Sequence, residues 1–451
     1  MYRKVESQIT DWIHSKGKEA LLLTGARQIG KTFLIRELLK RNNCDFVEFN
    51  LIEQPSLVPL FESAKMNEID AFLARLSVAT DHELVKDKTI IFFDEVQEFK
   101  DIVTAVKFLV EDGSFKYVMS GSLLGVELRD LRSAPVGYLS ILKMFPMNFK
   151  EFLIALKIKQ STLDYLRDCY EQKKEVDSFI HEKIIDAFYT YLVVGGMPRA
   201  VQTYIDENDF NKVSRIHEEI IALYKQDFTK YEERDKLKLI KTYDLIPSEL
   251  NSKTKRYVFT DLDKELKFDR YENSFNWLND AGVALPVFNT SEPDIPLKIN
   301  KQANLFKLFL SDIGMLSTMF GRATQIKLLE KAKDINFGAI FENAVAQELF
   351  AHGYEGYYFS SKKQGELDFV IEHEGKCLPI EVKSGKDYTR HNALSNVLAN
   401  ADYGIETALV LSNHNVSVEG KIAYLPVYMV MFIDEKATPI PQRERIDLSG
   451  I

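Results

Sequence analysis

Gly25-Ala26-Arg27-Gln28-Ile29-Gly30-Lys31-Thr32 is the stretch that decides the fold of the first part of this 451-residue chain. It matches G-x-x-x-x-G-K-[ST], follows the apolar run ALLLT at 20–24 and precedes the helix-like run FLIRELLK at 33–40. A strand, a glycine-rich turn and a helix in this order predict a loop whose N–H groups surround a phosphate. A chance match in a chain of this length occurs about once in a hundred. We therefore expect a nucleotide site here.

The residue types of the loop suggest separate roles. Gly25 and Gly30 permit the backbone conformations that turn successive N–H groups inward. Lys31 is expected to bridge the β- and γ-phosphates, and the Thr32 hydroxyl to ligate Mg²⁺, so ATP and Mg²⁺ are the expected cofactors. The expected nucleotide contacts of this segment are Gly25, Ala26, Arg27, Gln28, Ile29, Gly30, Lys31, Thr32 and Phe33.

Two adjacent carboxylates end the next strongly apolar run, TIIFFDE at 89–95. Asp94 would hold Mg²⁺ through water, and Glu95 would orient and deprotonate the attacking water. Acidic residues also end strands simply because chains turn there, but a phosphate loop upstream favours the catalytic interpretation. Kinases that act on small molecules often lack the second carboxylate, so the pair Asp94-Glu95 favours an ATPase.

Two further motifs complete the candidate nucleotide site. The run YVMSGS at 117–122 predicts a strand that ends in hydroxyls, and Ser122 is expected to act beside Lys31 and Glu95 as a sensor of the γ-phosphate. An ordinary strand-to-turn Ser-Gly explains this run equally well. Gly195-Gly196-Met197-Pro198 interrupts a helical region, where Gly and Pro are costly. It is either a plain helix break or a turn that packs against adenine.

The composition bounds the class of protein. Apolar residues make up 45% and charged residues 28%, which excludes wholesale disorder, a collagen-like chain and a coiled-coil rod. The net charge of −9 means that any contact with nucleic acid needs a local basic face. Three scattered cysteines exclude a disulfide framework and a Cys-rich zinc site, and fit a reducing compartment. The longest late apolar run, 422–433, is shorter than the roughly 20 residues of a membrane span. With no secretory signal, we expect a cytoplasmic protein without a membrane partner.

The chain divides into four segments of different character. Residues 1–147 alternate apolar runs with helical stretches, which predicts an α/β fold with a parallel sheet covered on both faces. Residues 148–241 are helical in pattern. Residues 242–300 combine helices with the runs VALPVF and IPLKI, which suggests a winged helix. Residues 301–451 form a second α/β unit.

Several blocks together resemble a known family, the bacterial and archaeal AAA-type ATPases with a DUF4143 C-terminal region. The blocks are LTGARQIGKT, FFDEVQ, VMSGS, APVGYLSILKMFPMNFKEFL and VGGMPRAV, followed by FKLFLSDIGML, FENAVAQEL, GELDFVI and PIEVKSGK. The resemblance implies a P-loop NTPase core, a helical lid, a winged helix and a restriction-endonuclease-like C-terminal domain. It also implies that Gly196 and Pro198 correspond to the nucleotide-contacting G-x-P turn of related ATPases. Tyr138 departs from the family, because many relatives have Lys there.

A second candidate site lies in the last segment. Nucleases of the D…E-x-K type place an acid and an E-x-K on adjacent strands, where the carboxylates ligate Mg²⁺ and the lysine orients water. Asp368 and Glu381-Val382-Lys383 fit this pattern, because strand alternation sends Glu381 and Lys383 to one face. Glu342 could add a carboxylate. A nuclease-shaped domain that no longer cuts is the open alternative.

The predicted winged helix has a mixed charge. Its basic residues could follow a nucleic-acid backbone, but neighbouring acids nearly cancel them, so a solvated face is favoured. The bases are Lys253, Lys255, Arg256, Lys267 and Arg270, and the acids are Asp261, Asp263, Glu265 and Asp269. The aromatic residues of this segment have the spacing of a core rather than of base stacking, and are Tyr257, Phe268, Tyr271, Phe275 and Trp277.

Three functions are compatible with these features. The first is an ATP-hydrolysing switch coupled to a nuclease-like domain that acts on or binds DNA or RNA. The second is an ATP-gated module with an inactive nuclease fold that binds a protein partner, and the third is a plain nuclease with vestigial ATP binding. An oligomer is compatible with all three, and candidate arginine fingers are Arg199, Arg234 and Arg270.

Overall fold

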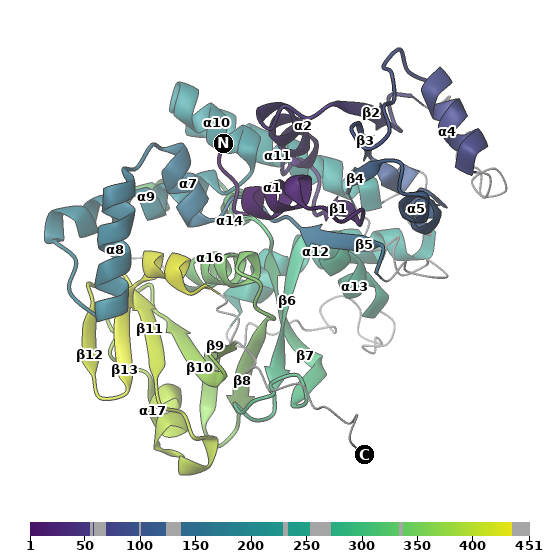
Figure 1. Ribbon diagram of the computed structural model, residues 1–451. Coiled ribbons are helices and arrows are strands. Elements are labelled where there is room, and N and C mark those ends of the chain that lie inside the picture. Colours follow the sequence, from purple (N-terminus) through teal and green to yellow (C-terminus); the bar gives the residue numbers. More distant parts are fainter. Residues whose placement is uncertain are drawn as a thin grey trace, which may run out of the picture.

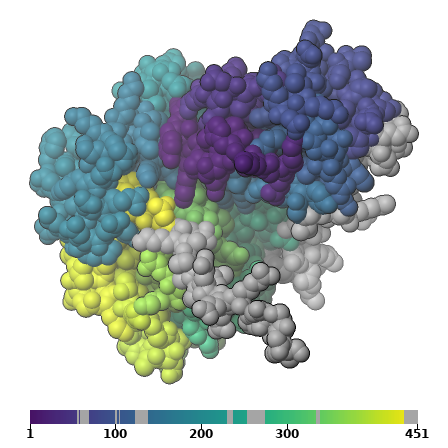
Figure 2. All heavy atoms as spheres, in the orientation of Figure 1, coloured from purple at the N-terminus to yellow at the C-terminus, as the bar shows by residue number. Residues whose placement is uncertain are grey.

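The computed structural model describes residues 1–54, 57, 69–98, 101–122, 137–228, 233–252, 272–332 and 337–434. These residues form two β-sheets with helices around and between them (Figure 1). The first sheet lies at the upper right of Figure 1 and the second at the lower left. In the space-filling view, the purple residues of the N-terminus and the yellow residues near the C-terminus mark the same two parts (Figure 2).

The first sheet confirms the predicted parallel α/β fold. Its strands pair in the order β2-β3-β4-β1-β5, and every pair is parallel. The strands are β1 Ala20–Thr24, β2 Phe46–Asn50, β3 Ile90–Asp94, β4 Lys116–Gly121 and β5 Leu139–Lys143. β1 and β3 are buried along their whole length, because helices cover both faces.

Alternation along β1 divides the first sheet between two apolar cores. Leu21 and Leu23 belong to the core that includes residues of α1 (Glu6–His14) and α2 (Lys31–Arg41). Ala20 and Leu22 belong to the opposite core, with residues of α4 (Ile69–Val78) and α5 (Asp101–Asp112). β5 is an edge strand, so one side of its backbone is left unpaired within this sheet.

A run of helices connects the two sheets, as the apolar periodicity predicts. The helices are α7 Phe149–Ala155, α8 Gln160–Gln172, α9 Ser178–Val194, α10 Pro198–Glu207, α11 Phe210–Phe228, α12 Glu233–Asn251 and α13 Glu272–Asp280. α7 starts with a capping box, in which Asn148 and Glu151 bond each other's backbone N–H groups. α9 ends at Gly195, whose φ of 68° suits glycine.

The second sheet is mixed and has the order β12-β13-β11-β10-β9-β8-β6-β7, which is also the left-to-right order of the labels in Figure 1. The strands are β6 Ala284–Thr290, β7 Lys301–Leu310, β8 Tyr357–Ser361, β9 Gly365–His373, β10 Lys376–Val382, β11 Ala408–Ser412, β12 Ser417–Glu419 and β13 Ile422–Pro426. β8, β9 and β10 form an antiparallel meander, and β11 runs parallel to β10.

The ribbon expected as the wing of a winged helix is part of this sheet. The run VALPVF forms β6 as predicted, but β6 also pairs in parallel with β8. The run IPLKI was expected to be the second strand, and this is wrong: residues 295–299 lie in a bend and turn, and β7 starts at Lys301. Pro296 offers no backbone N–H for a ladder, which explains the difference. The division into four domains stays a prediction.

Helix α16 (Gly338–Ala351) lies between the two sheets and is buried over most of its length (Figure 1). One apolar core runs from α1 and β1 through the connecting helices to α16 and β10. A separate core lies under α17 (Asn392–Ala399) on the other face of the second sheet. The remaining described helices are α14 Ile313–Phe320, α15 Arg322–Leu329 and the 3₁₀ segments Val96–Glu98, Ala401–Tyr403 and Val427–Phe432.

Candidate functional site

The glycine-rich loop joins β1 to α2 in the geometry that the motif requires. Gly30 caps α2 with a φ of 90°, and Gly25 has a φ of 143°. A Cβ at Gly25 would lie 2.2 Å from the carbonyl oxygen of Met144, so only glycine fits there. Gln28 also has a positive φ, of 67°. The loop N–H groups therefore turn toward the N-terminus of α2, where an anion is stabilised.

Lys31 is buried at the base of this loop. Its Nζ donates hydrogen bonds to the carbonyl oxygens of Gly25, at 3.0 Å, and Ala26, at 2.8 Å. Burial lowers its pKa from 10.5 to about 8, although the nearby carboxylates of Glu95 and Asp94 oppose the shift. Within the described residues, the Lys31 ammonium group donates its hydrogen bonds to carbonyl oxygens. A phosphate anion bound next to this desolvated cation would therefore be strongly attracted to it.

Asp94 collects hydrogen bonds from three neighbouring segments at the carboxyl end of β3. Thr32 Oγ1 lies 2.9 and 3.0 Å from the two Asp94 oxygens, and Asn50 Nδ2 donates to Oδ2 at 3.0 Å. Ser120 Oγ donates to Oδ1. Burial raises the pKa of Asp94. A buried carboxylate next to a threonine hydroxyl is a donor set that suits Mg²⁺, so the residues present fit this ion.

The sequence reasoning missed Asn50, and it named the hydroxyls of the run at 117–122 without assigning Ser120 a contact with Asp94. Asn50 is the last residue of β2, and Ser120 is the penultimate residue of β4. The carboxyl ends of parallel strands meet at one edge of a sheet, so polar residues closing the runs at 46–50 and 116–121 were the signal that could have found them.

Glu95 and Ser122 are joined through Gln97. Gln97 Nε2 donates to Glu95 Oε2 at 2.6 Å, and the Ser122 N–H donates to Gln97 Oε1 at 3.1 Å. Glu95 has a φ of 57°, a conformation that is uncommon outside glycine and that concentrates at functional sites. The two residues proposed for hydrolysis and sensing therefore lie at one edge of the sheet, with Gln97 as a residue that sequence reasoning missed.

Arg27 connects the loop with the helical region. Its Nε donates to Ser122 Oγ at 3.2 Å, and its Nη1 forms an ion pair of 2.8 Å with Asp227 of α11. Tyr224, also on α11, donates its hydroxyl to the carbonyl oxygen of Arg27 at 2.9 Å. The loop arginine therefore contacts both the predicted sensor and the predicted lid.

The Gly-Gly-Met-Pro turn lies against the same loop. The Gly196 N–H donates to Asp312 at 2.6 Å, and its carbonyl accepts from the Met147 N–H at 2.8 Å. A Cβ at Gly196 would lie 2.0 Å from the Met147 carbonyl oxygen, so this contact requires glycine. Burial raises the pKa of Asp312 to about 6.

Pro198 starts α10 and lines a pocket of about 270 Å³ together with Ile29, Gly30, Phe33 and Met147. The pocket is mainly apolar and adjoins the phosphate loop, as a site for a purine would. Arg3, another lining residue, donates to the Ile29 carbonyl oxygen at 2.8 Å. Arg3 is a further residue that sequence reasoning missed, because nothing in the N-terminal sequence indicates its contact.

Glu342, Asp368 and Glu381 of the second candidate site come from α16, β9 and β10, and Lys383 directly follows β10. Lys383 Nζ donates to Glu381 Oε1 at 2.6 Å, and Val382 packs in the core, which confirms the predicted alternation. Asp368 Oδ2 accepts from the Val382 N–H at 2.9 Å. Burial raises the pKa of Glu381 to about 7, and Asp368 and Glu342 add to the shift. Within the described residues, however, no three His, Cys, Asp or Glu side chains are arranged to hold a metal ion.

The other residues named in the sequence analysis lie outside the two candidate sites or outside the described residues. Arg199 forms an exposed ion pair with Glu219 at 2.6 Å. Tyr138 donates its hydroxyl to Glu111 at 2.7 Å. Arg270, the side chain of Arg234 and the basic and acidic residues proposed for the winged helix lie outside the described residues. Phe275 and Trp277 are buried in the main core, as their spacing predicts. No described helix has the length and apolar character that a bilayer crossing needs.

Comparisons with known families agree with this arrangement. Residues 17–153 match the AAA domain, and residues 337–430 match the DUF4143 domain of unknown function. The chain is thus a P-loop AAA-type protein with a DUF4143 region. Residues 185–326 match a further domain of unknown function, DUF8612, which lies between them. The AAA match supports ATP binding and hydrolysis by homology.

Two archaeal relatives are similar over most of the chain. The uncharacterized protein MJ1637 of Methanocaldococcus jannaschii is 25% identical over 441 residues, or 94% of this chain and 87% of the relative. The uncharacterized protein MJ1544 of the same organism is 23% identical over 368 residues, or 79% and 73% of the two chains. Among solved structures, a Walker-type ATPase of Pyrococcus abyssi is 13% identical with a TM-score of 0.41, covering 71% of this chain and 95% of that one.

Proposed function

We propose that this protein binds Mg-ATP at the AAA domain, hydrolyses it, and transmits the nucleotide state to the DUF4143 region. The observation that carries the proposal is the meeting of Thr32, Asp94 and Glu95 beside the phosphate loop. In the proposed complex, Lys31 and the loop N–H groups bind the phosphates, and Thr32 and Asp94 hold the ion. Mg²⁺ in such a site neutralises charge on the transferred phosphoryl group.

The chain's own residues have distinct tasks in this proposal. Glu95 accepts a proton from the attacking water, and Gln97 holds the Glu95 carboxylate in place at 2.6 Å. Ser122 and Arg27 lie where a change at the γ-phosphate would reach α11 through Asp227. Pro198 and Ile29 support the purine.

Transmission is supported by a buried hydrogen-bond chain between the purine pocket and α16. Tyr191 donates its hydroxyl to the Met147 carbonyl oxygen at 2.8 Å, and Gln347 Nε2 donates to the Tyr191 oxygen at 2.9 Å. Gln347 Oε1 accepts from the Ile313 N–H at 2.8 Å, next to Asp312, which holds Gly196. A displacement of Met147 or Gly196 therefore acts directly on the helix that carries Glu342.

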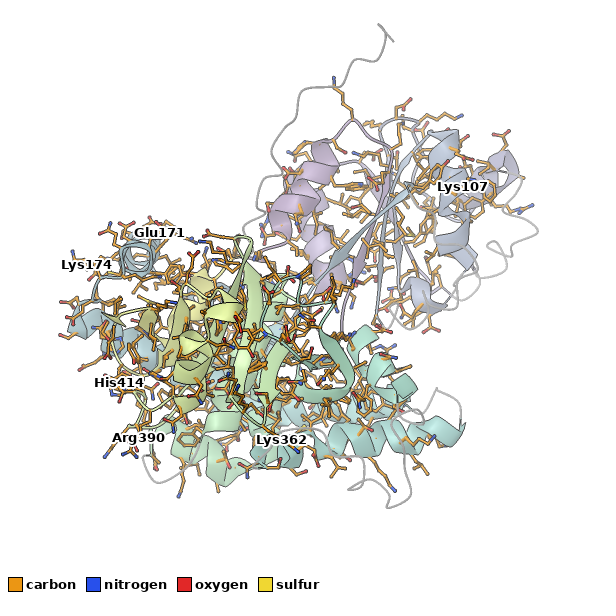
Figure 3. The ribbon with its side chains drawn as sticks, turned by 90° about the horizontal axis from the view of Figure 1, so that it is seen from below. Lys107, Glu171, Lys174, Lys362, Arg390 and His414 are labelled. Carbon is orange, nitrogen blue, oxygen red and sulfur yellow. The ribbon has the colours of Figure 1, made fainter. Side chains whose placement is uncertain are left out.

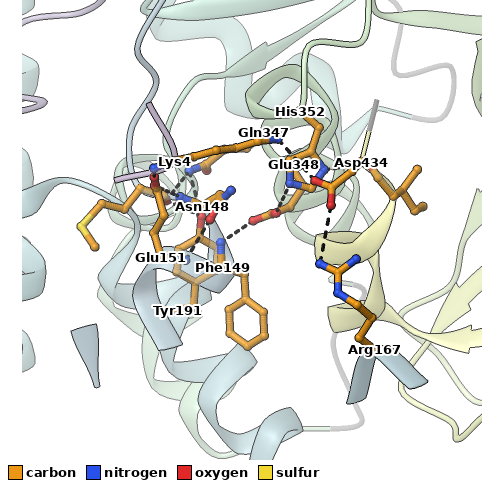
Figure 4. A network of polar contacts seen from close by, with 12 residues as sticks. Lys4, Asn148, Phe149, Glu151, Arg167, Tyr191, Gln347, Glu348, His352 and Asp434 are labelled. Atoms are coloured by element: carbon orange, nitrogen blue, oxygen red, sulfur yellow. Dashed lines mark hydrogen bonds and ion pairs between the residues drawn. The ribbon is translucent and has the colours of Figure 1, made fainter. Parts of the chain in front are cut away.

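Further polar contacts tie α16 to α7, and α7 to the N-terminal segment (Figure 4). Glu348 accepts from the Phe149 N–H, and burial raises its pKa to about 8. Lys4 donates its backbone N–H to Glu151 and pairs through Nζ with Asp434 at 3.3 Å. Glu348 thus holds α16 against α7, and Lys4 joins the N-terminal segment to α7 and to Asp434.

A restriction-endonuclease-like fold remains part of the proposal for the DUF4143 region. Its support is the element order α16, β8, β9, β10, α17, β11, with Asp368 and Glu381 on adjacent strands. The alternative, an ATP-gated partner-binding module with an inactive nuclease fold, is favoured by one observation: Lys383 neutralises Glu381 directly, at 2.6 Å.

Hydrolysis is tested by comparing Glu95→Gln with Glu98→Gln. Both changes remove one carboxylate, but Glu98 is exposed, whereas Glu95 lies beside Asp94. We expect Glu95→Gln to lose about 100-fold or more of the Mg²⁺-dependent ATP turnover while it still binds ATP, the range for removing a general base. Glu98→Gln should match wild type. Equal turnover in the two variants would contradict the assignment.

A further inference from the structure

A cleft of about 750 Å³ lies between the two sheets and is separate from the nucleotide site. One wall comes from the N-terminal segment and β5, and the other from β6, β7 and the turn between α16 and β8. We call it the lysine cleft, because Lys4, Lys143, Lys298 and Lys301 line it. Among the described residues that line it, Glu355 is the acidic one.

The charge of the lysine cleft is opposite to that of the whole chain. Four lysines face one glutamate here, whereas the chain carries a net charge of −9. Lys4 pairs with Asp434 at 3.3 Å, but Lys143, Lys298 and Lys301 have no ion pair with a described carboxylate. His352 lies in the cleft wall, and burial lowers its pKa to about 4, so it adds no charge at neutral pH. A cleft with one sign of charge attracts an anion.

Each wall combines a cation with a flat aromatic ring. Lys301 Nζ lies 3.6 Å from the ring centre of Phe288, and Lys143 Nζ lies 5.2 Å from that of Phe145. The protein around the cleft lowers the pKa of both lysines, mainly by partial desolvation. Both ammonium groups therefore interact favourably with a negatively charged partner, and each lies over one face of an aromatic ring.

We propose that the lysine cleft binds a short run of single-stranded nucleic acid, with phosphates on Lys143 and Lys301 and bases against Phe145 and Phe288. A nucleotide has an anion and a flat base in each unit, and each wall offers one contact for each. An acidic peptide would use the lysines but not the rings. Single-strand binding proteins combine a positive groove with aromatic stacking in this way.

The volume and the aromatic rings of the cleft favour a few unpaired nucleotides as its ligand. A volume of about 750 Å³ lies within the usual range for bound small molecules, ~300–1,000 Å³. In a duplex the bases are paired and stacked, so they offer no free face to the rings of the cleft, whereas unpaired bases do. The expected ligand is a few nucleotides with unpaired bases, supplied either by a long single strand or by a free oligonucleotide.

The test is fluorescence anisotropy with a labelled oligothymidine of about 12 nucleotides, within the ~4–16 of known single-strand sites. The variant Lys143→Ala/Lys301→Ala removes one lysine from each wall. The control Lys107→Ala/Lys174→Ala removes the same charge from exposed sites on α5 and beyond α8 (Figure 3). We expect the cleft variant to bind about tenfold or more weakly, and the control to bind within about twofold of wild type.

The salt dependence gives an independent readout. Each phosphate contact to a single strand contributes about −0.7 to the slope of log K against log salt. The cleft variant should therefore lose about 1.4 from this slope. Phe288→Leu should weaken binding without changing the slope, because it removes a ring and no charge. A trinucleotide that competes as well as the longer strand would identify the free oligonucleotide as the source.

Three results would overturn the proposal. They are an absence of binding by wild type up to about 100 µM, the weak end of nonspecific affinities, equal losses in the cleft and control variants, and a duplex that competes as well as the single strand. The inference does not rest on ATP hydrolysis. The cleft variant should keep the wild-type affinity for ATP, so failure here and failure of the proposed ATPase are separate outcomes.

Discussion

Thr32 and Asp94 are 62 positions apart in the sequence, yet the Thr32 hydroxyl lies 2.9 Å from the Asp94 carboxylate. The contact joins the first turn of α2 to the end of β3, and Ser120 and Asn50 complete the surroundings of the carboxylate. Because β1, β2, β3 and β4 are parallel strands of one sheet, their carboxyl ends bring these groups to the same edge.

Removing the Thr32 hydroxyl tests the role assigned to this contact. Thr32→Ala leaves Lys31 and the loop N–H groups in place but removes one oxygen proposed for Mg²⁺. We expect the affinity for Mg-ATP to fall about tenfold or more, consistent with ~1.5–3 kcal/mol for a hydrogen bond to a charged group. The affinity for ATP in EDTA should change much less. Equal losses with and without Mg²⁺, measured by titration with a fluorescent ATP analogue, would contradict the assignment.

The lowered pKa of Lys31 predicts how ATP affinity depends on pH. The protonated amine is the form that binds phosphate, and its pKa in the ligand-free protein is about 8. Affinity should therefore be nearly constant below about pH 8 and fall about tenfold per pH unit above it. The measurement is the Kd for Mg-ATP between pH 6.5 and 9.5, with circular dichroism at each pH to show that the fold persists. A flat profile to pH 9.5 would contradict the assignment.

The hydrogen-bond chain to α16 predicts that Tyr191→Phe weakens communication. This change removes the hydroxyl between Met147 and Gln347 and leaves the ring in the core. It also leaves a longer direct hydrogen bond of 3.3 Å from Gln347 Nε2 to the Met147 carbonyl oxygen. In a Glu95→Gln background, ATP should protect residues 338–351 from hydrogen exchange, and Tyr191→Phe should reduce that protection. Tyr189→Phe, on the same helix, is the matched control, because its hydroxyl contacts Asn413 instead. If Tyr191→Phe keeps the full wild-type protection of residues 338–351, the Tyr191 hydroxyl does not transmit the nucleotide state.

Ionisation of the buried Glu348 carboxyl group should destabilise the folded wild type as the pH rises. Its pKa is raised from 4.5 to about 8, so between these values the folded protein holds a proton that the unfolded chain lacks. The free energy of unfolding therefore falls as pH rises from about 4.5 to about 8. Glu348→Gln keeps an acceptor for the Phe149 N–H without the charge.

We expect Glu348→Gln to be about 1–2 kcal/mol more stable than wild type at pH 8, with the difference shrinking toward pH 5. Urea denaturation at several pH values measures this. The exposed Glu171 supplies the control, since Glu171→Gln should follow the wild type (Figure 3). A variant less stable than wild type at pH 8 would show that Glu348 is held ionised.

The parallel sheet and the nucleotide residues could be predicted from the sequence because both depend on local pattern. The motif from Gly25 to Thr32 and the run ending at Asp94 each combine a strand with a functional terminus. Gln97 and Arg3 could not be found in this way, because their contacts depend on how distant segments pack. Asn50 was missed although it closes an apolar run, which is a signal that the sequence contains.

In the second sheet, local apolar runs did not predict all of the strands or their pairing. The run IPLKI has the apolar content of a strand, but its proline cannot donate a hydrogen bond to a neighbouring strand. β6 pairs instead with β7, which starts at Lys301, and with β8. The E-x-K at 381–383 was singled out because it lies in an apolar run next to a run that carries Asp368, and the contact between Glu381 and Lys383 agrees with the predicted alternation. How close Asp368, Glu381 and Glu342 come to a metal-binding arrangement depends on side-chain packing that no pattern encodes.

Calorimetric titration of Mg-ATP into the wild type and Lys31→Ala is the most direct test of the nucleotide site. The predicted result is one saturable binding event per wild-type chain and a loss of about 100-fold or more in Lys31→Ala, in keeping with ~2–5 kcal/mol for a partner of a buried charge. Folded wild-type protein that releases or absorbs no heat with Mg-ATP, or a variant that binds as tightly as wild type, would contradict the account.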